Sequence, residues 1–298
     1  MTASTVPANR SDREPFGTTE WLLFWAVGLI WGSSFLLIKL GLKAFHPGVI
    51  TWGRVGLGGL ALAAVPAARR PVAREDWRQI LMLGVLWVAI PFTLFPIAQE
   101  HINSAVTGLL NGATPLFAGV IGGLWFNRVP RGPQRWGIAI GLVGIALISV
   151  GSSAIGGAAF VGVVMVLAAT LCYGFATNIA ASIQQKYGSV PVMARMLAVG
   201  SVLTAPFGLY GLSRSEFAAD SAIAVLFLGV VGTGVAFALM ATLVGRVGGP
   251  RATFITYLLP VVALILGVVF LSETVTVPAL VGVGLILAGA GLASRREH

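Results

Sequence analysis

The stretch NGATPLFAGVIGGLWFNRVPRGPQRWGIAIGLVGIAL (residues 111–147) has a related counterpart later in the chain, YLLPVVALILGVVFLSETVTVPALVGVGLILAGAGL (residues 257–292). The two stretches share residues at a constant spacing of 145: Pro115, Ala118, Gly122, Gly137, Leu142, Gly144 and Leu147 correspond to Pro260, Ala263, Gly267, Gly282, Leu287, Gly289 and Leu292. Towards the N-terminus the spacing shortens to 141, where Arg54 and Gly59 correspond to Arg195 and Gly200. The chain therefore carries one pattern twice.

The chain has too few charged residues to form the surface of a soluble protein. Of its 298 residues, 57% are hydrophobic and 10% are charged, whereas about 25% are charged in a typical soluble domain. Apolar runs long enough to cross a hydrocarbon core recur along the whole chain. They lack the polar–apolar alternation of outer-membrane barrel strands. We therefore predict an all-α integral membrane protein.

Loop signals such as Arg131-Gly132-Pro133 and Gly248-Gly249-Pro250 divide the apolar runs into spans. We predict ten transmembrane helices, at about residues 20–42, 48–68, 78–98, 103–126, 133–151, 159–183, 190–211, 221–245, 251–271 and 277–294. The fourth is expected to begin with Asn103 or Ser104 as its N-cap.

A duplicated unit with an odd number of crossings must insert its second copy upside down. The chain therefore predicts two inverted five-helix repeats, at residues 20–151 and 152–294, between an N-terminal tail (1–19) and a C-terminal tail (295–298). Inverted repeats are typical of secondary transporters.

The distribution of positive charge predicts an orientation. With the N-terminus inside the cell, fourteen Lys and Arg residues fall on the cytoplasmic side and only Lys43 and Arg214 on the outer side. This positive-inside asymmetry places both termini in the cytoplasm. The net charge of +9 is thus expected to contact anionic lipids of the cytoplasmic leaflet, and not nucleic acid.

Several segments resemble a known family. WGSSFLLIKLGL (residues 31–42) resembles the first helix of the drug/metabolite transporter superfamily, and the two stretches quoted above resemble the helix signatures of its EamA-type branch. The resemblance implies a ten-helix bacterial inner-membrane exporter of amino acids or other metabolites. It also implies a central site lined by spans one, three, four, six, eight and nine. One departure is that Arg128 stands where the family often has Glu, whereas the second repeat keeps Glu273.

Pro115 and Pro260 lie about half way along the fourth and ninth predicted spans. Proline removes a backbone hydrogen bond, and in lipid neighbouring groups must replace it. We interpret the two prolines as hinges that shape a central cavity and move during transport. A static packing kink is the alternative.

Polar and aromatic residues gather around these prolines. Asn111 is expected to line the cavity, because a lone amide at mid-membrane is costly without polar partners or water. Isolated hydroxyl groups can instead bond to the backbone of their own helix. The predicted substrate-binding residues are Trp31, Ser34, Trp87, Asn111, Thr114, Tyr173, Thr177, Phe254 and Tyr257.

Three basic residues, Lys39, Arg54 and Arg195, lie inside predicted spans. A cation at the centre of a membrane helix costs about 2.5–3.5 kcal/mol. Arg195 and Lys39 are near enough to span ends to snorkel. Arg54 or Lys39 is a candidate to attract a substrate carboxylate or to pair with Glu100, and a structural pair is the alternative. No acidic residue or histidine lies at mid-membrane, which favours facilitated export or coupling through Glu100.

The sequence lacks HExxH, GxSxG and phosphate-loop motifs, so we expect no enzyme activity, cofactor or metal site. The predicted function is export of small metabolites, amino acids first, by alternating access. The alternatives are uptake or exchange of another metabolite, efflux of a cationic drug, or a non-transporting sensor or scaffold. Closely spaced glycines in spans five and ten favour packing within a monomer over a homodimer interface.

Overall fold

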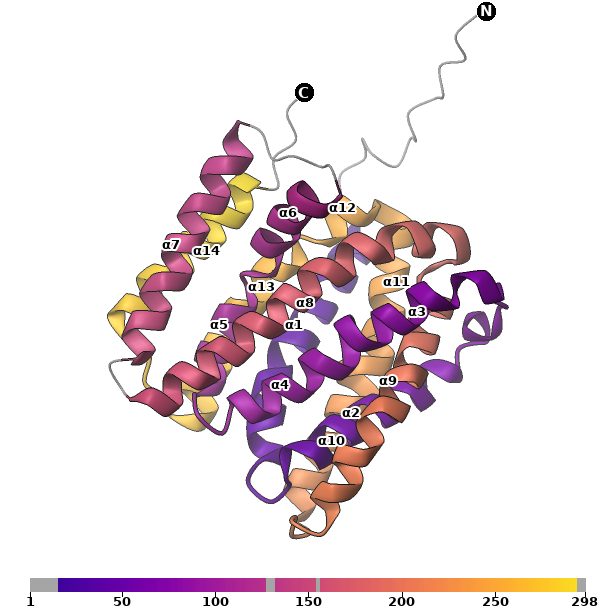
Figure 1. Cartoon of the computed structure of the whole chain (residues 1–298), viewed down its shortest axis with the longest axis horizontal. Helices are drawn as coiled ribbons and strands as arrows, with labels where there is room; N and C mark the ends of the chain where they lie inside the picture. Colours follow the sequence, from indigo (N-terminus) through magenta and orange to yellow (C-terminus); the bar gives the residue numbers. More distant parts are fainter. Residues whose placement is uncertain (1–15, 127–131, 154–155, 294–298) are drawn as a thin grey trace, which may run out of the picture.

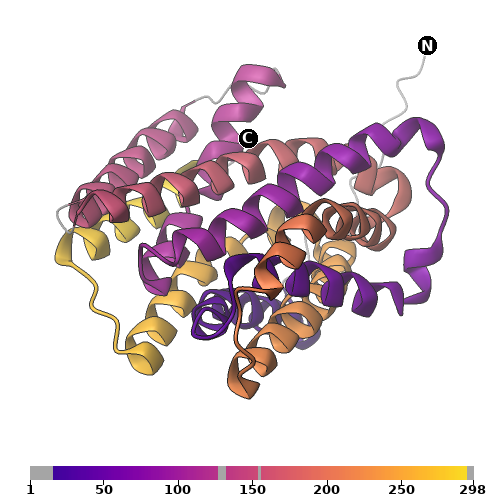
Figure 2. The same ribbon diagram turned by 60° about the horizontal axis from the view of Figure 1, so that its bottom comes forward.

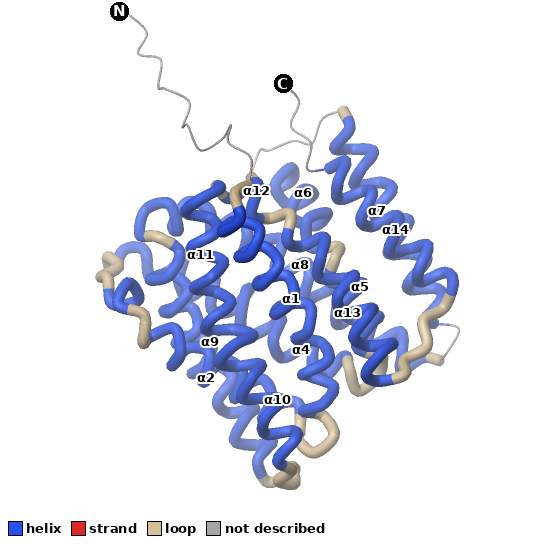
Figure 3. Tube along the Cα trace, turned by 180° about the vertical axis from the view of Figure 1, so that it is seen from behind, coloured by secondary structure: helices blue, strands red, loops and turns tan. Residues whose placement is uncertain are grey.

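The described structure is entirely helical. The computed structural model describes residues 16–126, 132–153 and 156–293, and these residues include no strand (Figure 3). Among them, six helical segments are long and apolar enough to cross a membrane, and three shorter helices are also apolar. With α2, which has 17 residues, these segments occupy the ten predicted spans. The predicted all-α membrane fold is confirmed.

The first five spans contain more than five elements because the third changes helix type and the fourth is interrupted. The elements are α1 (Thr18–Gly41), α2 (Pro47–Ala63), η2 (Pro66–Arg69), η3 (Arg74–Asp76), α3 (Trp77–Leu83), η4 (Gly84–Ala89), α4 (Ile90–Ala98), α5 (Ser104–Asn111), α6 (Thr114–Trp125) and α7 (Pro133–Ser153). The predicted N-cap of the fourth span is Asn103, whose side chain accepts a hydrogen bond of 3.0 Å from the Val106 amide.

The second five spans have the same plan. They are α8 (Gly157–Tyr187), α9 (Ser189–Leu212), α10 (Ala219–Gly229), η5 (Val230–Val235), α11 (Ala236–Val247), α12 (Gly249–Ala252), α13 (Ile255–Leu271) and α14 (Val277–Ala293). Both η4 and η5 are π-helical segments, and they occupy the middle of the third and eighth spans. A π segment inside an α-helix is rare and often marks a functional site.

The packing of the two repeats is reciprocal, as a two-fold relation requires. In the first repeat α2 packs against η5, and in the second α9 packs against η4. Likewise α1 packs against α13, whereas α8 packs against α6. The two last helices of the repeats, α7 and α14, lie side by side at one edge of the bundle (Figures 1 and 2). The inverted repeat is therefore visible in the helix contacts.

Glycines bring α7 and α14 together. A Cβ on Gly282 would lie 2.6 Å from the Gly144 carbonyl oxygen, and a Cβ on Gly289 would lie 2.6 Å from the Gly141 amide nitrogen. Any larger residue would push the helices apart. These predicted close glycines therefore pack inside one chain.

The bundle has a distal end and a proximal end. The distal end is formed by the C-termini of α1, α4 and α13 and by the N-termini of α2 and α5. At the proximal end, α1 begins and α14 ends (Figure 1).

Candidate functional site

Arg54 on α2 is the centre of a cluster of polar and aromatic side chains. Its Nε donates a hydrogen bond of 3.1 Å to Thr233 Oγ1, and its guanidinium carbon lies 3.8 Å from the centre of the Phe92 ring. Tyr173 on α8 packs against the buried hydrophobic cluster that contains Phe92. These four residues, named the Arg54 cluster, bring together the second, third, sixth and eighth spans.

Arg54 is buried deep in the bundle, with 7% of its surface exposed. Seven residues separate it from Pro47 and nine from Ala63, which is roughly 10 and 14 Å along the helix. No carboxylate among the described residues comes within ion-pair distance, and the two Nη atoms form no hydrogen bond there. The suggested pairing with Glu100 is not observed. A buried cation without an anionic partner is expensive, so this position is suited to an anionic ligand.

Three of the predicted binding residues surround this cluster. Ser34 is 3% exposed. Its Oγ lies close to Gly232, the residue before Thr233, at 3.6 Å from where a Cβ on that glycine would be. Trp31 packs edge-to-face on Phe237, with ring centroids 5.8 Å apart. Trp87 lies in η4 and packs against the same buried residues as the Arg54 cluster. That these three residues bind substrate stays a prediction.

The fourth span is interrupted immediately before Pro115. Helix α5 ends at Asn111 and α6 begins at Thr114, whose hydroxyl donates a hydrogen bond of 2.8 Å to the Asn111 carbonyl oxygen. The Asn111 side-chain oxygen is buried without a hydrogen bond. A Cβ on Gly112 would lie 2.7 Å from Pro260 Cγ. The interruption thus packs directly on the second proline.

The two prolines do not form a matched pair of breaks. Pro260 lies inside the continuous helix α13, whereas the ninth span is interrupted at residues 253–254, six residues earlier. The predicted symmetry of the two kinks therefore differs from the structure. Gly112, the residue that follows α5, fits against the Pro260 ring, so the first interruption packs on a proline that lies within a continuous helix.

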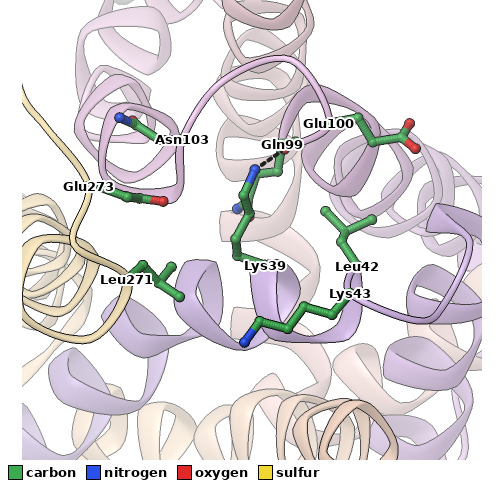
Figure 4. A pocket seen from close by; sticks show the side chains of 8 residues that line it. All are labelled: Lys39, Leu42, Lys43, Gln99, Glu100, Asn103, Leu271 and Glu273. Carbon is green, nitrogen blue, oxygen red and sulfur yellow. Dashed lines mark hydrogen bonds between the residues drawn. The ribbon is translucent and has the colours of Figure 1, made fainter. Parts of the chain in front are cut away.

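A separate pocket lies at the distal end, where the two repeats meet. The Lys39 ammonium donates hydrogen bonds to the backbone oxygens of Gln99 (2.5 Å) and Ile102 (3.5 Å). Figure 4 shows Lys39 between Glu273 and Glu100. Lys39 therefore satisfies carbonyls at the end of the third span, where a positive charge also complements the helix dipole.

Glu273 caps the start of the fourth span from the other repeat. Its Oε1 accepts a hydrogen bond of 2.8 Å from the Ser104 amide, and its Oε2 accepts one of 2.8 Å from the Ala105 amide and one of 3.0 Å from the Ser104 hydroxyl. The negative charge is favourable at the α5 N-terminus. The equivalent residue of the first repeat, Arg128, lies outside the described residues.

Arg195 lies at the proximal end, and its guanidinium group bonds to backbone carbonyl oxygens. Its Nη1 donates to the Ala68 carbonyl oxygen (3.1 Å), and its Nη2 donates to the Arg70 carbonyl oxygen (2.7 Å). These bonds hold the connection between α2 and α3, as a basic side chain that reaches toward the end of its span can do. Nearby, Lys186 on α8 pairs with Asp76 at 2.7 Å.

Three further predicted binding residues, Thr177, Tyr257 and Phe254, make contacts of their own. The Thr177 hydroxyl bonds to the Gly174 carbonyl oxygen of its own helix. Tyr257 donates a hydrogen bond of 2.6 Å to the Ala290 carbonyl oxygen of α14. Phe254 is 45% exposed and stacks near Tyr257, with ring centroids 6.0 Å apart. Thr177 lies one turn after Tyr173 on α8, whereas Phe254 and Tyr257 lie on the ninth span.

Sequence reasoning missed Phe92, Thr233 and Gln99. Phe92 was matched to Phe237 in the repeat alignment but was not assigned to a site. Thr233 is a single hydroxyl in an apolar span, and only its proximity to Arg54 distinguishes it. Among the described residues, no group of three His, Cys, Asp or Glu side chains is placed to hold a metal ion.

Comparison with known proteins identifies a family. The description "EamA-like transporter family" matches residues 19–150 and again residues 160–295. An "Uncharacterized transporter" of Archaeoglobus fulgidus is 21% identical over 93% of this chain and 99% of its own. A "Probable terminal-alkyne amino-acid exporter" of Streptantibioticus cattleyicolor is 27% identical over 91% of this chain and 93% of its own.

Two further comparisons agree. The "Uncharacterized inner membrane transporter YedA" of Escherichia coli K12 is 26% identical over 88% of this chain and 86% of its own. A solved crystal structure with 18% identity superimposes with a TM-score of 0.63 and covers 93% of this chain and 97% of the other. The fold is therefore one that has been seen before.

Proposed function

The chain belongs to the EamA-like transporter family, and from this premise we propose that it exports amino acids across a bacterial inner membrane by alternating access. The solute would bind in the Arg54 cluster, with its carboxylate on the guanidinium group. A "Probable terminal-alkyne amino-acid exporter" among the relatives supports this solute class.

The observation that carries the proposal is the unpaired cation at the middle of α2. Arg54 has one side-chain hydrogen bond and one aromatic face, and its fork of N–H groups suits a carboxylate. A bound carboxylate would supply the missing negative charge. The Phe92 and Tyr173 rings offer an apolar surface beside it for the side chain of an aliphatic or aromatic amino acid.

The helix geometry supports a route for the conformational change. The Arg54 cluster includes Thr233 of one π-helical segment, and the fourth span is interrupted next to Pro115. Irregular helices at a repeat interface are the places where inverted-repeat transporters bind and bend. We propose that Pro115 and Pro260, with Gly112 between them, act as a joint hinge.

The orientation follows from charge. With the arginine-rich proximal end in the cytoplasm, both termini are cytoplasmic and the basic side chains contact anionic lipids. The distal end then faces the outside, and export runs from the proximal to the distal end.

Counterflow in proteoliposomes tests the proposal. Vesicles loaded with unlabelled L-leucine should accumulate labelled L-leucine, and accumulation should fall in Arg54→Gln. A panel of other amino acids, organic acids and amines should be run in parallel. If no solute of the panel moves, the protein is not a carrier of these classes, and a sensor or scaffold role gains weight.

A second candidate is uptake or exchange of another metabolite that bears a carboxylate, which the same Arg54 argument supports. Efflux of a cationic drug is disfavoured, because the central cation would repel the drug in a low-dielectric site. Transport of an amine in preference to L-leucine would reverse this order.

A further inference from the structure

The pocket at the distal end is separate from the Arg54 cluster and has its own polar lining. It has a volume of about 490 Å³. Residues from three places in the chain line it: the end of α1, the turn after α4 and the segment after α13. Figure 4 shows Lys39 and Glu273 pointing toward the middle of this lining, with Glu100 and Lys43 at its rim. The pocket therefore lies across the interface between the two repeats.

One polar group in this lining has no partner. The side chain of Gln99 is completely buried, and neither its Nε2 nor its Oε1 makes a hydrogen bond. Leaving a buried amide unsatisfied costs about 1–3 kcal/mol for each group. Buried polar groups in proteins are usually hydrogen-bonded to protein or to ordered water, so this amide marks a polar spot behind the pocket wall.

The charged groups of the pocket are of both signs, and two of them are free. Lys39 and Glu273 are engaged with the backbone at the two ends of the turn at residues 99–104. Lys43 and Glu100 have no side-chain hydrogen bond or ion pair in the described structure. A free cation and a free carboxylate thus face one cavity.

The remaining walls are apolar. Leu42 at the end of α1 and Leu271 at the end of α13 are half-buried and line the same space. A ligand with one ammonium group, one carboxylate and an aliphatic side chain matches this arrangement. A purely anionic ligand would be repelled by Glu100 and Glu273, and a purely cationic one by Lys39 and Lys43.

We propose that this pocket is a second solute site, on the release side, which takes an aliphatic α-amino acid in its zwitterionic form. The ammonium group binds Glu100, the carboxylate binds Lys39 and Lys43, and the side chain packs on Leu42 and Leu271. This inference rests on the proposed function for the choice of solute, but not for the existence of the site.

Protection of an introduced cysteine tests the site without transport. In a Cys172→Ser background, Leu42→Cys is labelled with a maleimide in detergent solution, with L-leucine added at increasing concentration. L-Leucine should slow the labelling. 4-Methylpentanoate, which lacks the ammonium group, and 3-methylbutylamine, which lacks the carboxylate, should each need at least about tenfold higher concentration, as loss of one charge-assisted contact predicts.

Two variants test whether Glu100 in particular binds the ammonium group of L-leucine. Glu100→Gln should raise the protecting concentration of L-leucine by about tenfold. Glu216→Gln, which makes the same change on an exposed residue of another distal loop, should leave it unchanged. Equal protection by all three compounds, or no effect of Glu100→Gln, would overturn the site.

Failure of this site is distinguishable from failure of the proposed function. If L-leucine shows counterflow but never protects Leu42→Cys, the carrier stands and the second site is lost. If L-leucine protects Leu42→Cys but shows no counterflow, the pocket is a binding site and the carrier proposal is lost. Protection should persist in Arg54→Gln, because the two sites have no residue in common.

Discussion

Arg54 and Arg195 occupy equivalent positions in the two repeats, yet only the Arg195 guanidinium group has several hydrogen-bond acceptors around it. Arg195 has carbonyl partners at the proximal end, whereas the Arg54 guanidinium has one hydroxyl and one ring in the interior. Gene duplication alone would give both arginines the same surroundings in an inverted arrangement. The difference shows that equivalent arginines have different surroundings in the two repeats, and only Arg54 has room in its hydrogen bonding for the ligand proposed above.

The backbone does not share this difference. Both repeats have a π segment in their third span, and each segment packs against a glycine of the other repeat. A Cβ on Gly58 would lie 2.6 Å from Thr233 Cγ2, and one on Gly200 would lie 2.9 Å from Val88 Cβ. The repeats therefore keep one helix geometry and differ in the side chains that the geometry brings together. The substitutions below test this comparison.

The largest effect is expected from Arg54→Gln. Removal of a charged hydrogen-bonding partner of the solute costs about 1.5–3 kcal/mol, so counterflow of L-leucine should fall by about tenfold to a hundredfold. The matched change Arg195→Gln should leave the affinity for L-leucine nearly unchanged. If Arg54→Gln and Arg195→Gln reduce L-leucine counterflow equally, or if Arg54→Gln reduces transport of solutes without a carboxylate as much, the difference between the two arginines is structural only.

The next effect concerns the contact between the two hinge regions. Gly112→Ala would place a Cβ against the Pro260 ring and should destabilise the protein by about 1–3 kcal/mol, measured as thermal unfolding in detergent. Adding Pro260→Ala should restore part of this loss, because it removes the clashing Cγ. Gly284→Ala, where the new Cβ would meet open space, is the control.

The same variants test the hinge itself. Pro260→Ala alone should insert normally and slow the exchange of L-leucine several-fold, and so should Pro115→Ala. Wild-type exchange rates in both variants would remove the hinge and leave a static packing contact.

A smaller effect is expected at Glu273, the residue of the second repeat that caps the N-terminus of α5. Glu273→Gln keeps the shape of the side chain but removes the charge at the α5 N-terminus, which should cost about 1–2 kcal/mol. The melting temperature should fall, whereas Glu216→Gln should not change it. An unchanged melting temperature in Glu273→Gln would show that the cap is dispensable.

The smallest effect is expected when equivalent residues of the two π segments are exchanged. Thr233→Val removes the hydroxyl that positions Arg54 and should weaken L-leucine affinity by about 0.5–1.5 kcal/mol, or about twofold to tenfold. Val88→Thr makes the reverse change at the equivalent place and should not alter affinity. If Val88→Thr has the larger effect, the solute binds nearer the first π segment than we propose.

Much of the fold was predictable from the chain alone. The spacing between Pro115 and Pro260 indicated the repeat, and the length of the apolar runs indicated the spans. The site was predictable only in part. Of the predicted binding residues, Tyr173 belongs to the Arg54 cluster and Ser34 lies beside Gly232, the neighbour of Thr233, whereas Phe254 and Tyr257 pack on each other in the ninth span. That these residues bind the solute stays a prediction. Helical periodicity tells which residues share a face of one helix, and not which other helix that face meets.

The amino-acid sequence by itself determined the membrane class, the ten spans and the inverted repeat, because hydropathy and spacing are properties of a one-dimensional chain. Only the tertiary structure decided which basic residue lacks a partner. Arg54 and Thr233 are 179 residues apart, and their contact depends on how α2 packs against the other repeat. A buried charge is defined by what surrounds it, and that is settled only when distant helices come together.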